Sequence, residues 1–246
     1  MYSSDFGKDF LWGVATAAAQ IEGAANSYGK GPSIWDTFSK RTGKIKKGHN
    51  PSEACDFYHR YPEDIALVKT LGFNVFRFSI AWSRIFPLGY GAVNAAGVAF
   101  YHKVIDECLK QGITPMVTLY HWDLPEALSK EGGWTAFGIN SHFNEYATFC
   151  AKEYGDSVKH WIVVNEPFGF TSLGYMLGVH APGVNGVSNF FDAALHTAIA
   201  QADGAKILRA EVKDAIIGTA FSCSEIVPYT QSSQDLMAAK RVDALM

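Results

Sequence analysis

The sequence predicts an α/β fold of the (β/α)8 barrel type, of which this chain supplies roughly the first five βα units. Three observations lead to this prediction. Five short apolar segments that resemble buried strands alternate with segments of helical periodicity, which is typical of a parallel sheet with right-handed crossovers. Polar or aromatic side chains repeatedly follow the strand ends. The glycine-rich phosphate turn that is usual in open doubly wound sheets does not follow the first strand.

The predicted elements alternate along the whole chain. Apolar runs predict strands, whereas apolar residues spaced three or four apart, often followed by glycine, predict helices. The strands are expected at residues 10–16, 73–80, 113–120, 161–164 and 215–221. The helices are expected at residues 55–71, 94–112, 139–155, 188–210 and 235–246. Residues 26–52 form a loop that is longer than ordinary connections, which favours a functional rim.

Length and charge narrow the class of protein. A chain of 246 residues is long enough for one barrel domain, and we expect residues 1–246 to form a single domain. Charged residues make up 18%, against about 25% in typical proteins, which indicates much buried or interface-forming surface. The net charge is −3 and we see no basic stripe, so we expect no nucleic-acid partner.

Cysteine usage and hydropathy predict the compartment. The four cysteines lie far apart without a Cys-x-x-Cys pair, which favours reduced thiols. No apolar run approaches the roughly 18 residues of a membrane span, and the amino-terminal segment lacks the apolar stretch of a signal peptide. We therefore expect a soluble, cytoplasmic protein without a membrane partner.

The most informative stretch is the fourth strand and the Asn-Glu-Pro sequence that follows it. Residues 161–164 are apolar and three of them are β-branched, which predicts a strand buried on both faces. Asn165 and Glu166 then stand at its carboxyl end, and Pro167 stops further ladder pairing. The carboxyl ends of barrel strands hold the chemistry of these folds, so Glu166 is a candidate general acid. The alternative is that Glu166 is a surface residue in a loop after a core strand.

Three other polar side chains are candidates for the same site. Arg77 lies inside the second strand, and a buried guanidinium requires an acceptor, which predicts a site role or a structural ion pair. Gln20 follows the first strand, which predicts a site role. The alternative is that Gln20 and Glu22 only form hydrogen bonds with local backbone groups. His121 follows the third strand. It is a site residue, a hydrogen-bonded core histidine or a metal ligand, although no second histidine lies at ligand spacing.

Several motifs occur in the same order as in a known family. Residues 10–23 resemble the amino-terminal signature of the family 1 glycoside hydrolases, the β-glucosidase family. The match continues through the motifs at residues 31–38, 76–80, 118–125, 165–167 and 180–183. Asn-Glu-Pro alone is shared by related barrel glycosidases, but several long motifs in register are far more specific. The resemblance implies a TIM barrel and a retaining β-glycosidase that hydrolyses terminal β-linked glucosyl residues, with no cofactor and no metal.

The resemblance also implies roles for individual residues. Glu166 would protonate the glycosidic oxygen and later activate water as the base. Gln20, His121 and Asn165 would hydrogen-bond the hydroxyls of the sugar at the cleavage point. Trp122 would offer an apolar face to that sugar, with a packing role as the alternative.

The nucleophile that the family uses is the part that this sequence does not provide. In the family it comes from a Thr-Glu-Asn-Gly-like segment on the seventh strand, and Arg77 would orient it. Retaining hydrolysis needs two carboxylates about 5–5.5 Å apart. We expect Arg77 to contact another carboxylate, a bound anion or water instead. Phe168 and Ser222 depart from the family, which often has Trp and Asn there, and this bears on the leaving group that is preferred.

Two functional hypotheses follow from the resemblance. In the first, the chain is the amino-terminal part of a β-glucosidase and acts on a β-glucoside once a complementary carboxyl-terminal fragment is supplied. In the second, the chain is a catalytically inactive half-barrel. It either assembles through its open strand edges, for example with a second copy of the chain, or only binds sugar. In both, the open edges lead us to expect that residues 1–246 are not a stable monomer.

Overall fold

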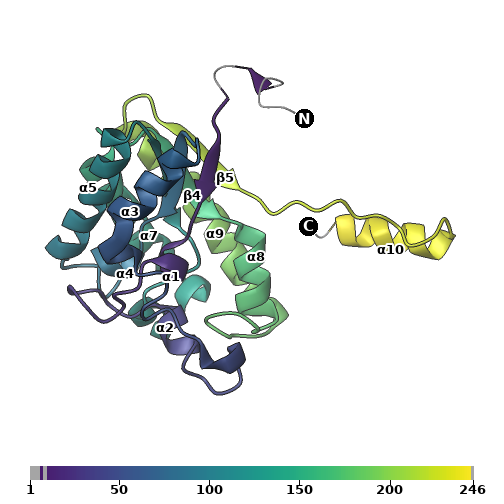
Figure 1. The fold of residues 1–246 in the computed structure, drawn as a ribbon. Helices are drawn as coiled ribbons and strands as arrows, with labels where there is room; N and C mark the ends of the chain where they lie inside the picture. The colour runs from purple at the N-terminus through teal and green to yellow at the C-terminus, as the bar shows by residue number, and fades with distance from the viewer. Residues whose placement is uncertain (1–5, 8–9, 245–246) are drawn as a thin grey trace.

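The described part of the chain forms one sheet of five parallel strands with helices packed on its outer side, as seen in a computed structural model (Figure 1). The structure describes residues 6–7 and 10–244, so the last two residues of the helix predicted at 235–246 lie outside the described residues. The strand order is β1-β2-β3-β4-β5, which is also the order along the chain. Each strand pairs in parallel with the next, and this confirms the prediction of five consecutive βα units.

The strands lie where apolar runs predict them, with one substantial difference. Their bounds are β1 Gly13–Ala15, β2 Val75–Ser79, β3 Thr114–Tyr120, β4 His160–Asn165 and β5 Ile216–Ala220. The first strand is much shorter than the predicted 10–16. Phe10, Leu11 and Trp12 are 40%, 48% and 38% exposed and lie outside the ladder. Strand pairing begins at Gly13. The backbone of the preceding residue, Trp12, bonds Asn74 instead: the Trp12 N–H donates to the side-chain oxygen of Asn74, and the Asn74 N–H donates to the carbonyl oxygen of Trp12.

Long helices cover the outer face of the sheet (Figure 1). These helices are α3 Phe57–Thr70, α5 Ala95–Lys110, α7 Ile139–Tyr154 and α9 Val187–Glu211, whereas a fifth long helix, α10 Ser233–Asp243, lies away from the sheet. The first four match predicted helices closely, because their buried residues recur at helical spacing, as in Phe143, Tyr146, Ala147 and Cys150 of α7. α9 packs against α7 and against β4 and β5.

Shorter helices lie between the strands and the long helices and were not predicted. They are α1 Ala18–Ile21, α2 Ile34–Phe38, α4 Trp82–Ile85, α6 Glu126–Lys130 and α8 Pro167–Thr171, with the 3₁₀ turns η2 Lys46–Gly48 and η3 Gly133–Thr135 and the π-helical turn η4 Ser172–Met176. α2 and η2 lie within the segment 26–52 that we expected to be a loop. α1, α4 and α8 come within a few residues of the carboxyl ends of β1, β2 and β4. They therefore fix the backbone at the edge of the sheet where barrel enzymes hold their sites.

The inner face of the sheet is open. The register aligns Arg77, Met116, His160 and Ile216 across β2 to β5 on this face, and all four side chains retain solvent exposure. By contrast, the outward-facing residues of the central strands are buried in the hydrophobic core, as Val117 and Trp161 are. β1 and β5 each have a neighbour on one side only. The sheet is thus a sector of a barrel rather than a closed one.

The last described segment extends away from the sheet and its helices. Figure 1 shows α10 (yellow) at the end of an extended connection from β5. No residue of α10 is buried, and its apolar Leu236, Met237 and Val242 are 38%, 53% and 44% exposed. Among the described residues no helix combines the length and the apolar character needed to cross a bilayer.

Candidate active site

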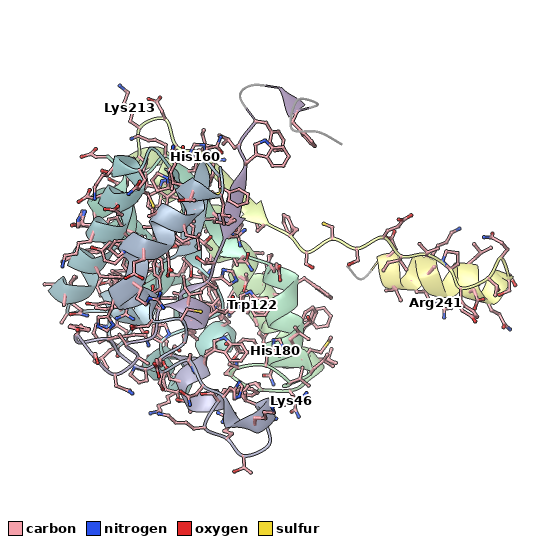
Figure 2. All side chains as sticks on the ribbon, viewed as in Figure 1. Lys46, Trp122, His160, His180, Lys213 and Arg241 are labelled. Carbon is pink, nitrogen blue, oxygen red and sulfur yellow. The ribbon has the colours of Figure 1, made fainter. Side chains whose placement is uncertain are left out.

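An open pocket of about 540 Å³ lies at the carboxyl ends of the strands. All six predicted site residues line it, and they come from four separate parts of the chain: Gln20, Arg77, His121 with Trp122, and Asn165 with Glu166. Figure 2 shows Trp122 and His180 in the lower part of the molecule and His160 and Lys213 at the opposite end. The sequence-predicted residues are therefore brought together at one end of the sheet.

Arg77 and Asn165 are joined across the inner face. Nη2 of Arg77 donates to Oδ1 of Asn165 over 2.6 Å, although the two residues are 88 positions apart. Desolvation lowers the pKa of the half-buried Arg77, and the negative charge of Glu166 acts in the opposite sense. No salt bridge of Arg77 is found among the described residues. The acceptor within the protein is thus an amide oxygen, whereas a carboxylate was one of the three contacts that we expected, beside a bound anion and water.

Glu166 is held at the end of β4 by its backbone. Its N–H donates to the carbonyl oxygen of Ala220 over 2.8 Å, which extends the pairing between β4 and β5 by one residue. It then adopts φ 46° and ψ 65°, a left-handed conformation that is uncommon outside glycine. Pro167 follows at the first position of α8. This abrupt change of direction places the half-buried carboxylate in the pocket wall rather than on an outer loop.

Trp122 fixes the other side of the same backbone segment. Its indole Nε1 donates to the carbonyl oxygen of Asn165 over 2.8 Å, and its own backbone is left-handed with φ 72°. Its ring lies against Gly169 of α8, because a Cβ built on Gly169 would stand 3.1 Å from the ring and 3.4 Å from Oε2 of Glu166. Trp122 therefore packs against the Glu166 turn and lines the pocket at the same time.

His121 is an uncharged group at neutral pH. Burial lowers the pKa of its imidazole to about 4, and the nearby charge of Arg77 adds to the effect. Its Nδ1 is buried without a hydrogen-bond partner among the described residues. A neutral imidazole has one donor and one acceptor nitrogen, which suits a hydroxyl-bearing ligand.

Gln20 and Glu22 differ sharply although both follow β1. Gln20 is exposed and lines the pocket. Glu22 is buried and binds Nε of Arg84 over 2.9 Å, while its other oxygen accepts from the Tyr101 hydroxyl over 2.6 Å. Glu22 is therefore a structural residue behind the pocket.

The pocket also contains residues to which the sequence analysis gave no role. Trp35 and His180 line it, with ring centroids 5.6 Å apart, and the ring of His180 lies 5.9 Å from that of Trp122. Both belong to motifs of the family resemblance, at residues 31–38 and 180–183, which was the available signal. Ile45, His49 and other residues of the predicted loop 26–52 complete the rim. Within the described part of the chain, no group of three His, Cys, Asp or Glu residues is arranged to hold a metal.

Comparison with known proteins gives one consistent answer. The sequence model of glycosyl hydrolase family 1 matches residues 2–246. Beta-glucosidase A of Thermotoga maritima is 44% identical over 235 residues, which cover 96% of this chain and 53% of that protein. Beta-glucosidase 42 of Arabidopsis thaliana is 44% identical over 247 residues, which cover 98% of this chain and 50% of that protein.

The structural comparison agrees. The solved structure of the Thermotoga maritima beta-glucosidase in complex with deoxynojirimycin superposes with a TM-score of 0.94 at 44% identity. The match covers 96% of this chain and 54% of that one. The chain thus spans about half the length of the curated relatives that it matches.

Proposed function

Because this chain belongs to glycosyl hydrolase family 1, we propose that it is the amino-terminal part of a retaining β-glycosidase that releases terminal β-linked glucosyl residues. Relatives named as beta-glucosidases, and one solved with deoxynojirimycin bound, support the glucosyl preference. The observation that carries the proposal is the convergence of six separately predicted residues on one pocket that contains Glu166. No cofactor is needed for this chemistry.

Glu166 is the proposed acid and base. In its protonated form it donates to the glycosidic oxygen as the leaving group departs, and as a carboxylate it later removes a proton from water. Trp122 and the left-handed turn hold the Glu166 backbone, so the carboxylate presents a defined geometry to the bond. Gln20, Asn165 and the neutral His121 supply hydrogen bonds to the sugar hydroxyls, and Trp122 also presents its apolar face to the ring.

The nucleophile must come from outside the described residues. Glu166 is the single acidic residue that lines the pocket in the described part of the chain, whereas retaining hydrolysis requires a second carboxylate about 5–5.5 Å away. We propose that a complementary carboxyl-terminal part of the barrel supplies it and that Arg77, which already donates to Asn165, orients it. The polypeptide that completes the sheet is therefore also the partner that completes the chemistry.

A complementation assay tests the proposal. The chain is combined with the carboxyl-terminal half of a family 1 relative, and the complex, here called the assembled enzyme, is isolated by size-exclusion chromatography. We expect hydrolysis of 4-nitrophenyl β-D-glucoside, with β-glucose as the first product in proton NMR. A folded complex that leaves the glucoside intact, or that first releases α-glucose, would contradict the proposal.

The second candidate is an inactive half-barrel that assembles through its open edges or only binds sugar. The single pocket carboxylate and the two open strands favour it. It predicts that the assembled enzyme binds glucose or deoxynojirimycin in calorimetry but shows no turnover. The same assay therefore separates the two candidates. For either one we propose a cytoplasmic protein, supported by four cysteines that are all free thiols.

A further inference from the structure

The loop that carries η2 concentrates positive charge. Residues 40–47 contain five cationic side chains, Lys40, Arg41, Lys44, Lys46 and Lys47, in a chain whose net charge is −3. No aspartate or glutamate occurs between Thr37 and Ser52. We call these five residues the basic loop. The net charge of the whole chain conceals this local charge, and we expected no basic stripe from the sequence.

The basic loop is anchored at the mouth of the pocket. Nη1 of Arg41 donates to the carbonyl oxygen of Pro182 over 2.9 Å, and Nζ of Lys44 donates to that of Gly178 over 3.4 Å. Both cations also lie over the ring of Phe38, at 5.6 and 5.5 Å from its centroid. The segment that accepts these bonds contains a residue of the pocket, His180. The loop therefore holds its charge at a defined place beside the site.

No acidic side chain in the described residues neutralises this charge. None of the five cations takes part in a salt bridge there. The facing wall has none to offer, because no aspartate or glutamate occurs between Pro167 and Phe191. Burial lowers the pKa values of His121 and His180, so the positive charge at neutral pH resides on the lysines and arginines.

A second hollow connects the basic loop to the site. It measures about 490 Å³, and two residues of the basic loop, Lys40 and Arg41, line it. It shares Ser39, Ile45 and Asn50 with the pocket that contains Glu166. A ligand that extends outward from the pocket past Ile45 thus enters a cationic hollow. A run of charge on a merely solvated face would lack both the anchoring bonds and this continuity with a pocket.

We propose that the site takes β-glycosides whose leaving group carries a negative charge, such as a carboxylate. This inference rests on the proposed function and adds an orientation to it, with the terminal sugar near Glu166 and the leaving group directed toward the mouth of the pocket. Positive potential in a cleft raises the local concentration of anionic ligands and favours their binding. Because the lysines are exposed, the preference is expected to weaken as salt increases.

Two uncleavable ligands test the proposal in the assembled enzyme. They are 4-carboxyphenyl 1-thio-β-D-glucoside and its neutral carboxamide, whose inhibition constants are compared during hydrolysis of 4-nitrophenyl β-D-glucoside. At about 20 mM ionic strength we expect the carboxylate to bind roughly three- to tenfold more tightly, and the ratio to fall toward one at about 0.5 M salt. An equal affinity at low salt would overturn the proposal while leaving the proposed function intact.

A pair of variants with matched charge locates the effect. In Lys40→Glu, which changes a lysine that lines the hollow, we expect the carboxylate-to-carboxamide preference to fall toward one. The control Lys213→Glu makes the same change in net charge, and Figure 2 shows its position away from Lys46, Trp122 and His180. Its ligand preference should match the unmodified protein. Equal losses in both variants would contradict a local basic site, and absence of glucoside hydrolysis in every form would overturn the proposed function instead.

Discussion

Arg77 donates a hydrogen bond of 2.6 Å to Asn165, and this contact links β2 to the turn that carries Glu166. The same guanidinium lowers the pKa of His121 by its charge, although burial of the imidazole is the larger cause. One cation therefore holds the amide in position and lowers the pKa of a neighbouring ring further than burial alone does.

Replacement of Arg77 should uncouple these two effects. In Arg77→Met we expect the pKa of His121 to rise from about 4 toward its ordinary value, because the nearby positive charge is gone. Arg77→Lys is the matched control, since it keeps the charge but loses the planar fork. NMR titration of the imidazole in the assembled enzyme measures the change. An unaltered pKa in Arg77→Met would show that burial alone accounts for the low value.

Substitution of Gly169 should disturb the Glu166 carboxylate. A Cβ at this position would stand 3.1 Å from the Trp122 ring, so the ring must move by a few tenths of an ångström, and it would lie at ordinary contact distance, 3.4 Å, from Oε2 of Glu166. The Trp122 indole holds the backbone next to Glu166, so its movement would shift the carboxylate. We expect Gly169→Ala to lower kcat by about tenfold, since misplacement of a catalytic group weakens proton transfer. Gly138→Ala is the control, because a Cβ there meets nothing within 4 Å. Equal activity of the two variants would contradict the account.

Asp123 should make stability fall as pH rises. Burial raises its pKa to about 7, with a smaller contribution from Glu22, whereas the ordinary value of 3.8 applies in the unfolded chain. Between these pH values the folded protein keeps a proton that the unfolded chain has lost, so the free energy of unfolding decreases from about pH 4 to about pH 7 and is then level. The difference in pKa corresponds to at most about 4 kcal/mol.

Thermal melting of the assembled enzyme at pH 5 and pH 8 checks this expectation. The melting temperature of the unmodified protein should be lower at pH 8 than at pH 5. In Asp123→Asn, whose side chain cannot ionise, this decline should be smaller by several degrees. Asp106→Asn, an exposed position on α5, should leave the decline unchanged. The account is wrong about Asp123 if both variants retain the full decline.

The open sheet should prevent the chain from existing as a stable monomer. An unpaired buried polar group costs roughly 1–3 kcal/mol, and a domain has only about 5–15 kcal/mol of net stability. Ile216, 59% exposed on the inner face of edge strand β5, adds unfilled apolar surface. We expect sedimentation to detect self-association or unfolding of the isolated chain. A monodisperse monomer that melts cooperatively would contradict this prediction.

A charged substitution on the open face refines the same test. Ile216→Lys should abolish association with a carboxyl-terminal partner, because it places a charge where the barrel interior would close. Leu67→Lys changes a residue of similar exposure, 55%, on the outer helix α3, and should leave association intact. Loss of assembly in both variants would indicate general destabilisation rather than docking on the inner face.

The sequence predicted the sheet well because apolar runs and helical spacing report burial directly. It did not predict the short helices after the strands, which depend on contacts between distant segments. Asn94 illustrates the difference. It is the first residue of the helix predicted at 94–112 and lies at the N-cap of α5, but its side-chain amide donates to the carbonyl oxygens of Tyr28 and Arg84 instead of capping the helix. Such a choice depends on which carbonyl groups the fold brings near.

The polar residues that line the pocket were predicted to a similar extent, and their roles stay predictions. The candidates were found because polar residues at strand ends are few, and because the family motifs contain them. The partner of Arg77 was not predicted, since the amide of Asn165 comes within reach only through the turn at Glu166, where the backbone is left-handed. The anchoring of the basic loop was missed for the same reason, because its acceptors lie more than 130 residues further along the chain.

The role of Glu166 is tested most directly by the leaving-group dependence of Glu166→Gln in the assembled enzyme. Only a poor leaving group needs a proton in the transition state, so the account predicts a much larger loss of kcat/KM for alkyl or weakly acidic phenyl β-glucosides than for 2,4-dinitrophenyl β-D-glucoside. A difference of about 10²-fold or more between the two classes is expected for general acid catalysis. An equal loss for both classes would contradict the assignment of Glu166 as the acid and base.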